Sequence, residues 1–239
     1  MKNILIFGAS GSIGKYIYNS FTKLNTGDYP CHVYGTTSKK IRLIPGFIEH
    51  TEKYIHVDND NLDNLRNIKN VDIIVWCQGY NVNDNIFTFS EEEYLHIMNT
   101  NVLFIIKTLN FLLKNNKINN NAKLVIISSI WQELARENKL SYTISKSALS
   151  GLVKNLSYDL SKYNILINNV LPGVIDNEMS RKTLSEEQFN YIKKYLFFDR
   201  FVNVDDIFQA VKFLCVENTG ITGESIKVDL GFSHIRKYN

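Results

Sequence analysis

The sequence is poor in cysteine. Its 239 residues include only Cys31, Cys77 and Cys215, which lie far apart and form no CxxC pair. This number and spacing exclude a disulfide framework and indicate no zinc site. The five histidines show no HExxH or comparable ligand spacing, so we expect no metal centre. These features fit a reducing compartment, and we expect the protein to be cytoplasmic.

Long apolar runs and a concentration of charge are also missing. Only four apolar residues, 4–7, precede the first glycine, which is too few for the core of a signal peptide, and no run approaches the length of a membrane span. The net charge is +3, and the lysines and arginines are dispersed rather than gathered into a basic stripe. We therefore expect neither a membrane nor a nucleic acid as a partner.

Short β-branched and aromatic runs alternate with stretches of helical periodicity. The strand-like runs are 3–7, 32–34, 54–57, 71–76, 123–128, 166–170 and 225–229, and the helical stretches include 13–24, 91–113, 142–163 and 204–216. This alternation predicts an α/β fold with a parallel sheet covered on both faces. The asparagine-rich stretch 114–123, "KNNKINNNAK", has no periodicity, and we predict that it is an exposed loop.

The first strand-like run leads into the glycine-rich stretch "IFGASGSIGK". A strand followed by glycines and a helix places backbone N–H groups and the positive end of the helix where a phosphate can bind. A Walker A loop is excluded, because Gly8 and Gly14 are separated by five residues and Tyr16 follows Lys15. The GxGxxG fingerprint is absent too. The GxxGxxG spacing leaves two interpretations, a pyrophosphate-binding turn or simply a tight strand-to-helix turn.

A second motif, "SYTISK", places Tyr142 and Lys146 four residues apart at the start of a predicted helix, hence on one face. An ammonium group beside the phenol would lower its pKa from about 10 toward 7, worth roughly 4 kcal/mol of phenolate stabilisation. Ser129 ends a buried strand, where a hydroxyl could bind a carbonyl oxygen as negative charge develops on it. A YxxxK pair alone also occurs on exposed helices, so the combination with Ser129 is what indicates a reactive site.

These three residues, together with Asn101 of "MNTNVLF", resemble the catalytic tetrad of the short-chain dehydrogenase/reductase family. The resemblance covers essentially the whole chain, and the length favours the shorter branch, which includes the 3-oxoacyl-carrier-protein reductases. It implies one domain over residues 1–239, built as a Rossmann-like doubly wound parallel sheet of about seven strands with helices on both faces. It also implies an oxidoreductase that interconverts a carbonyl and a secondary alcohol of a small molecule by hydride transfer.

The resemblance also implies a role for each member of the tetrad. Tyr142 would give or take the proton as general acid/base, and Lys146 would lower its pKa and bind the nicotinamide ribose. Ser129 would orient the substrate oxygen. Asn101 would hold a relay water. The glycine turn would then bind the pyrophosphate of a nicotinamide dinucleotide.

The segments that would bind this dinucleotide follow from the same resemblance. Besides Tyr142 and Lys146, the implied cofactor residues are Gly8, Ser10, Gly11, Ser12, Ile13, Gly14, Thr36, Thr37, Ser38, Asp58, Asn59, Gln78, Gly79, Pro172, Gly173, Ile175 and Asn177. The end of the second predicted strand, "VYGTTSKK", carries hydroxyls and Lys39 but no acid, so we expect NADP(H) to be preferred, with NAD(H) as the alternative.

The sequence departs from the family pattern at several positions, among them Phe7 and Asn177, which each stand where the family commonly has Thr. Ser12 replaces the second glycine, and the run Trp76, Cys77, Gln78 and Gly79 replaces Asn-Asn-Ala-Gly after the fourth strand. The altered run 76–79 motivates an alternative, a dinucleotide-binding redox sensor without catalytic activity. A sugar-nucleotide epimerase or dehydratase is a weaker alternative, because no added substrate domain is expected. Apolar residues on several faces of 91–113 and 142–163 favour a homodimer or homotetramer.

Overall fold

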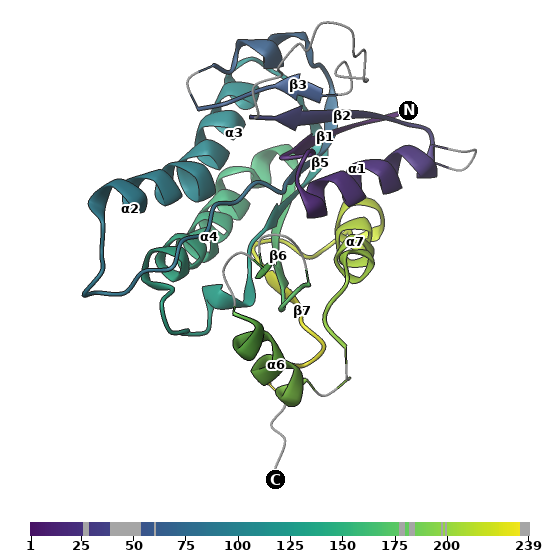
Figure 1. The fold of residues 1–239 in the computed structure, drawn as a ribbon. Helices are drawn as coiled ribbons and strands as arrows, with labels where there is room; N and C mark the ends of the chain where they lie inside the picture. The colour runs from purple at the N-terminus through teal and green to yellow at the C-terminus, as the bar shows by residue number, and fades with distance from the viewer. Residues whose placement is uncertain are drawn as a thin grey trace, which may run out of the picture.

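The computed structural model describes residues 1–25, 29–38, 54–59, 61–176, 180–181, 185–196, 198 and 200–234. Within these ranges, seven strands form one sheet in the order β3-β2-β1-β4-β5-β6-β7, and all neighbours are parallel (Figure 1). The strands are β1 Lys2–Phe7, β2 Cys31–Thr37, β3 Tyr54–His56, β4 Val71–Trp76, β5 Ile118–Ile127, β6 Leu166–Pro172 and β7 Ser225–Val228. This confirms the predicted fold class.

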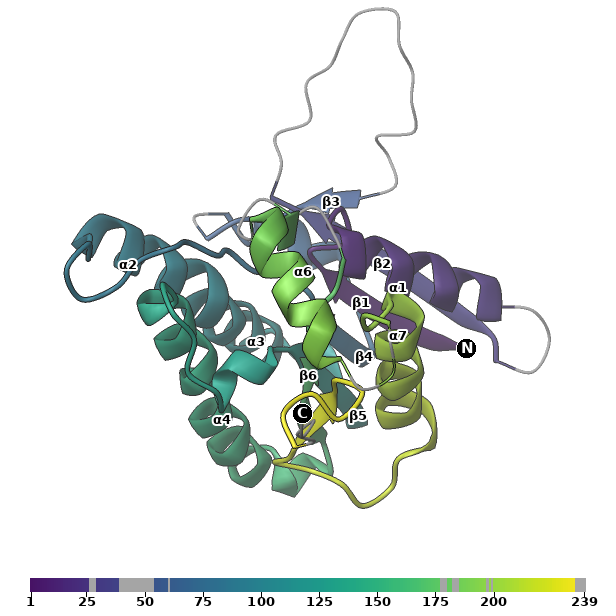
Figure 2. The same cartoon turned by 60° about the horizontal axis from the view of Figure 1, so that its bottom comes forward.

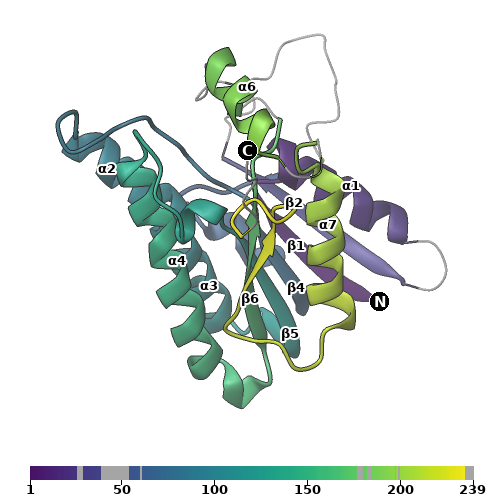
Figure 3. The same cartoon turned by 90° about the horizontal axis from the view of Figure 1, so that it is seen from below.

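Helices cover both faces of the sheet. The helices of the described residues are α1 Ser12–Leu24, α2 Glu91–Met98, α3 Phe104–Lys114, α4 Leu140–Asp159, α6 Glu186–Tyr195 and α7 Val204–Lys212. Figure 3 shows α3 and α4 on one face, α1 and α7 on the other. Figures 2 and 3 show α6 apart from both layers, beyond the end of the sheet at which β6 and β7 finish. None of the helices in the described part of the chain is long and apolar enough to cross a membrane.

The alternation of side chains along β1 shows why the sheet needs both helical layers. Leu5 and Phe7 belong to the core that contains Phe104 of α3, whereas Ile4 and Ile6 belong to the core on the α1 and α7 side. All four β1 side chains are fully buried. A strand that is apolar on both faces is stable only between two layers, as in doubly wound folds.

Two predicted helices are less regular than their periodicity indicated. The stretch 91–113 is divided into α2 and α3 by a π-helical turn, Asn99–Leu103, and α7 ends in a second π-helical turn, Phe213–Glu217. Such turns insert one residue without breaking the apolar periodicity, so periodicity cannot reveal them. The first of them contains Asn101.

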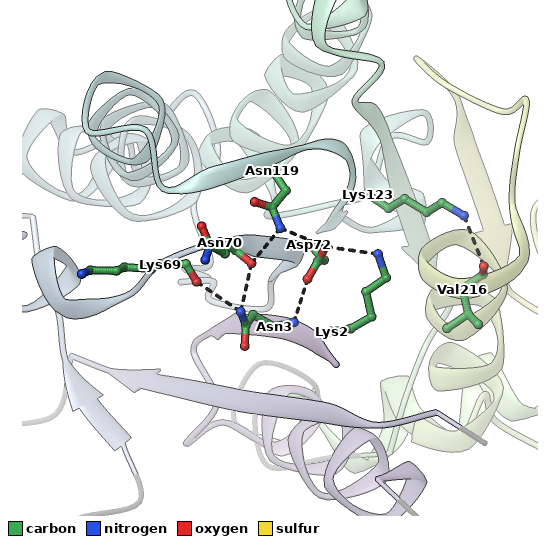
Figure 4. Close-up of polar contacts among 8 residues, drawn as sticks. All are labelled: Lys2, Asn3, Lys69, Asn70, Asp72, Asn119, Lys123 and Val216. Atoms are coloured by element: carbon green, nitrogen blue, oxygen red, sulfur yellow. Dashed lines mark hydrogen bonds and ion pairs between the residues drawn. The ribbon is translucent and has the colours of Figure 1, made fainter. Parts of the chain in front are cut away.

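The asparagine-rich stretch is not the exposed loop that we predicted. Its second half forms the start of β5, where Ile118 pairs with Val71 before the register shifts and Lys123 pairs with Ile73. Asn119 Nδ2 donates to the carboxylate of Asp72 at 3.1 Å (Figure 4). The prediction was wrong because side-chain hydrogen bonds, rather than apolar alternation, stabilise this part of the strand.

Further contacts in Figure 4 extend this network to β1. The Asn3 backbone N–H donates to Asp72 at 2.9 Å, and the carbonyl of Asn70 accepts from both Asn3 and Asn119 at 3.1 Å. These bonds cross-link β1, β4 and β5 at the edge of the sheet where the strands begin. They fix the register of the central strands, and with it the position of their opposite ends.

Candidate active site

The strand order reverses beside β1, whose neighbours are β2 and β4. In open parallel sheets, ligands bind outside the carboxyl ends of the strands at such a reversal. The polypeptide between β1 and α1 is the glycine turn. Gly8 has φ +72°, and a Cβ there would lie 2.7 Å from the backbone nitrogen of Gln78. A Cβ on Gly14 would overlap the carbonyl oxygen of Gly8. Both positions therefore require glycine.

A cavity of about 470 Å³ opens beside this turn. Six of the predicted cofactor residues line it, namely Gly8, Thr36, Ser38, Asp58, Asn59 and Gln78. The sequence did not indicate Lys107, which also lines the cavity and donates from Nζ to the Asn59 carbonyl at 3.2 Å. The structure thus brings together segments that lie up to 99 residues apart in the sequence.

Unsatisfied polar atoms indicate what this cavity can bind. Both amide atoms of Gln78 are buried and have no hydrogen-bond partner within the described part of the chain. The same holds for Asn59 Oδ1. Buried polar groups without partners are unfavourable until a ligand satisfies them. Donors and acceptors beside a helix N-terminus fit a ligand that carries hydroxyls and phosphates, so the residues present fit a dinucleotide.

The remaining predicted cofactor residues are placed in different ways. The Thr37 hydroxyl hydrogen-bonds to that of Ser10 at 2.8 Å, and Thr37 is buried, whereas Ser38 is exposed. Gly11 lies in the turn, where its backbone N–H donates to the Gly8 carbonyl at 3.0 Å. Ser12 and Ile13 are the first two residues of α1. Ser38 is therefore the exposed hydroxyl residue at the described end of β2, and it lines the cavity together with Thr36.

Three predicted cofactor residues lie at and after the end of β6, on the opposite side of β1 from β2 in the strand order. Pro172 is the last residue of β6, and the Gly173 N–H donates to the Val228 carbonyl at 2.9 Å. Ile175 is buried and forms an isolated β-bridge with Val202. Asn177 and Lys39 lie outside the described residues.

Tyr142 and Lys146 lie in the first two turns of α4, as their spacing predicted. The Lys146 ammonium nitrogen is 5.7 Å from the centroid of the Tyr142 ring and donates to the Ile127 carbonyl at the end of β5, at 3.2 Å. Ser129 caps the 3₁₀-helical turn after β5, where its hydroxyl accepts from the Trp131 N–H at 3.3 Å. Lys146, Tyr142 and Ser129 are all buried.

Burial sets the charge states of this pair. It raises the pKa of Tyr142 to about 12, while a hydrogen bond with the Ser129 side chain acts in the opposite direction. It lowers the pKa of Lys146 to about 8, against the opposing influence of Cys77. The spacing predicted a lowered pKa for Tyr142, but in the chain by itself desolvation of the phenolate raises it. Tyr142 is therefore protonated at neutral pH.

Asn101 holds the segment after β4 against this pair. Its Oδ1 accepts from the Tyr80 N–H at 2.8 Å, and its Nδ2 donates to the Tyr80 carbonyl at 3.0 Å and to Ser145 Oγ at 2.9 Å. A Cβ on Gly79 would lie 3.8 Å from both Asn101 Oδ1 and Lys146 Nζ. The Asn101 side chain thus bonds to both the segment after β4 and helix α4. Gly79 has no Cβ, which allows this segment to lie close to Asn101 and Lys146.

Sequence reasoning missed a polar cluster that joins the same segment to the start of α4. Lys139 is only 2% exposed and bonds to the side chains of Asn81 and Asn83. The Asp84 carboxylate accepts from the backbone N–H and the hydroxyl of Ser141. No family motif marks these residues, and the only available signal was a set of polar residues beside a predicted strand end and a predicted helix start.

A parallel sheet that reverses beside a glycine turn, with a tyrosine, a lysine and a serine at the same edge, defines a Rossmann-type dinucleotide-binding oxidoreductase. Residues 63–233 match the family described as enoyl-(acyl carrier protein) reductase. The chain belongs to the short-chain dehydrogenase/reductase family, whose members are NAD(P)-dependent enzymes acting on CH–OH groups.

Relatives match over almost the whole chain. The 3-oxoacyl-(acyl-carrier-protein) reductase FabG of Rickettsia typhi is 28% identical over 243 residues, which cover 96% of each protein. The L-rhamnose 1-dehydrogenase (NADP(+)) of Thermoplasma acidophilum is 27% identical over 96% of this chain and 95% of that protein. The crystal structure of a short chain dehydrogenase family protein from Francisella tularensis gives a TM-score of 0.80 at 25% identity, over 98% of this chain and 99% of that one.

Proposed function

We propose that the protein is an NADP(H)-preferring reductase that converts the carbonyl of a small molecule to a secondary alcohol, with Tyr142 as the proton donor. One observation carries the proposal: a buried, protonated phenol lies near a lysine nitrogen and a serine hydroxyl, at the sheet edge where the cavity beside the glycine turn opens. The reverse reaction would use the same groups with Tyr142 as the base.

The cofactor would be held along the strand ends. The turn from Gly8 to Gly14 would bind the pyrophosphate, Asp58 and Asn59 the adenine, and Gln78 with Gly79 a ribose. Residues 172–177 would line the nicotinamide side. When bound, NADPH supplies a hydride from nicotinamide C4. Preference for NADP(H) is supported by the exposed Ser38 and the lack of an acid at the end of β2, and NAD(H) is the alternative.

The proton chemistry follows from the charges of the chain itself. Tyr142 holds its proton at neutral pH and can pass it to an alkoxide that forms next to Ser129. The tyrosinate left behind would lie near the Lys146 ammonium, whose nitrogen is 5.7 Å from the ring centroid, and a nearby positive charge favours the anion. Ser129 would orient the substrate oxygen, and Asn101 would keep the segment after β4 in place.

Only the names of the relatives indicate which class of substrate this chain could use. Their names indicate a 3-oxoacyl thioester or a sugar as candidates for this chain. We further propose that residues 1–239 form one domain of a cytoplasmic homodimer or homotetramer. An apolar groove of about 530 Å³ between α3 and α4, lined by residues such as Ile106, Leu152 and Leu156, supports contact with a second copy.

The test is turnover with a carbonyl panel that includes acetoacetyl-CoA and aldoses, with NADPH and with NADH. We expect carbonyl-dependent oxidation of NADPH by the wild type and a loss of about 100-fold or more in Ser129→Ala. Tight NADPH binding without turnover on the whole panel would instead favour the redox sensor.

A further inference from the structure

A second buried lysine lies next to the candidate proton donor. Lys139 Nζ is 5.9 Å from the centroid of the Tyr142 ring, almost the same distance as Lys146 Nζ on the following turn of α4. Lys139 comes just before α4 and is 2% exposed. Two ammonium groups thus lie close to one phenol, although the motif that identified the site contains only Lys146.

The hydrogen bonds of Lys139 show that its nitrogen is an ammonium. Nζ donates to Asn81 Oδ1 at 2.9 Å, to the Val82 carbonyl at 3.4 Å and to Asn83 Oδ1 at 2.5 Å. Three acceptors require three N–H donors, which only the protonated form supplies. All three bonds reach the segment that follows β4.

No carboxylate neutralises this charge directly within the described ranges. The nearest acid in the cluster, Asp84, uses its oxygens for the N–H and hydroxyl of Ser141. Burial and the charge of Arg136 lower the pKa of Lys139 to about 8, and Asp84 acts in the opposite direction. A buried cation whose hydrogen bonds all go to neutral oxygens is unfavourable for stability, and such groups concentrate at functional sites.

The other groups around Tyr142 lack negative charge as well. Lys146 faces the ring from the same helix, and Ser129 faces it from the turn after β5. Cys77, at the end of β4, interacts with Lys146, and burial raises the pKa of its thiol, so Cys77 is neutral. The Asp84 carboxylate, which bonds to Ser141 next to Tyr142, is the acidic group of this cluster, and it does not bond to either lysine within the described ranges.

We propose that Lys139 is a positioning residue for proton transfer: its charge acts together with that of Lys146 to stabilise the tyrosinate form of Tyr142, while its three hydrogen bonds fix residues 81–83 beside the ring. The proposal rests on the proposed function and deepens it, because it assigns a second cation to the proton donor. A clamp without an electrostatic role would hold the segment but would leave the ionisation of Tyr142 unchanged.

The test is an NMR titration of protein labelled with ¹³C at tyrosine Cζ, with saturating NADP⁺ bound, in which Tyr142→Phe identifies the Tyr142 signal. Lys139→Gln removes the charge but keeps a hydrogen-bond donor. It is expected to raise the midpoint of Tyr142 by about one to two pH units, because the removed charge lies at a distance of 5.9 Å in a medium of effective dielectric constant about 20.

A control variant separates charge from clamping. Asn83→Ala removes one hydrogen bond of Lys139 and leaves the charge, so the midpoint of Tyr142 should stay within about 0.3 units of the wild type.

Equal midpoints for Tyr142 in the wild type and Lys139→Gln would overturn the proposal. An equal shift in Asn83→Ala would also overturn it, in favour of a clamp. If Lys139→Gln does not fold, Lys139→Arg provides the test, because it keeps the charge and should not raise the midpoint; a rise of about one unit would contradict the proposal. If Lys139→Gln raises the midpoint of Tyr142 but the wild type turns over no carbonyl, the proposed function is wrong and this inference still holds.

Discussion

The Lys146 ammonium nitrogen lies 5.7 Å from the centre of the Tyr142 ring, one helical turn further along α4. Because α4 packs against the end of β5, where Lys146 bonds to the Ile127 carbonyl, the pair is held at the edge of the sheet where the cavity lined by Gly8 and Gln78 opens. Burial keeps the phenol protonated, and the hydrogen bond with the Ser129 side chain acts in the opposite direction. The protonated phenol is the form that the proposed function requires.

Gly14→Ala should destabilise the protein and weaken dinucleotide binding, since the added methyl group would overlap the Gly8 carbonyl. We expect a loss of about 2 kcal/mol in the free energy of unfolding, measured with urea. Gly151→Ala is the matched control, because a Cβ there meets no described atom within 4 Å in the middle of α4. It should stabilise by about 0.5–1 kcal/mol. Equal effects at the two positions would show that the turn is not sterically constrained.

Gln78→Ala should weaken the binding of NADPH without destabilising the folded protein. The amide has no partner in the described chain, so its removal should leave the free energy of unfolding of the cofactor-free protein equal or higher. The Kd for NADPH should rise about tenfold. Gln132 provides the contrast, because its amide bonds to Ser128 and Ser225 at 2.9 Å. Gln132→Ala should cost about 2 kcal/mol of stability without changing the Kd. A destabilised Gln78→Ala with normal NADPH affinity would refute a binding role.

Ser38→Asp should change cofactor preference. Ser38 is the exposed residue at the end of β2 and lines the cleft, and a carboxylate there would repel a 2′-phosphate and bind ribose hydroxyls. The ratio of NADPH to NADH affinity, measured by calorimetry, should fall at least about tenfold, or 1.4 kcal/mol. Ser38→Ala should change it far less. An unchanged ratio in Ser38→Asp would place the adenosine ribose elsewhere.

Lys146 should make stability rise with pH in the alkaline range. Its pKa is about 8 in the folded protein and 10.5 as its ordinary value, so between these values the unfolded chain binds more protons than the folded one. Deprotonation therefore favours the folded state as pH increases. Relative to Lys146→Met, the wild type should gain about 2 kcal/mol in the free energy of unfolding across this window, measured by urea unfolding without cofactor. A constant difference between the two proteins would mean that Lys146 titrates normally.

The sequence predicted the parts of the fold that depend on local pattern. The run at β4 was predicted with its observed bounds, Val71–Trp76, because a near-continuous apolar stretch is typical of a strand buried on both faces. The start of β5 was missed. It depends on Asn119 reaching Asp72, 47 residues away, and no local pattern encodes that contact.

The candidate site, like the fold, could be predicted from the sequence only in part. The spacing of Tyr142 and Lys146 identified one face of a helix, but spacing carries no information on burial, and burial reversed the direction of the Tyr142 pKa shift. Lys139 was missed because a lysine is usually exposed, and its partners Asn81 and Asn83 lie 58 and 56 residues earlier in the chain. Only the fold shows that this charge is buried beside the phenol.

The most direct test is a single-turnover measurement with NADPH deuterated at nicotinamide C4, in the wild type and in Tyr142→Phe, using the best carbonyl from the panel. The wild type should transfer deuterium to the carbinol carbon. Tyr142→Phe should bind NADPH with a Kd within about twofold of the wild type but transfer deuterium at least about 1,000-fold more slowly, because the proton donor is gone. Equal transfer rates in the two proteins would contradict the assignment of Tyr142 as the group that supplies the proton.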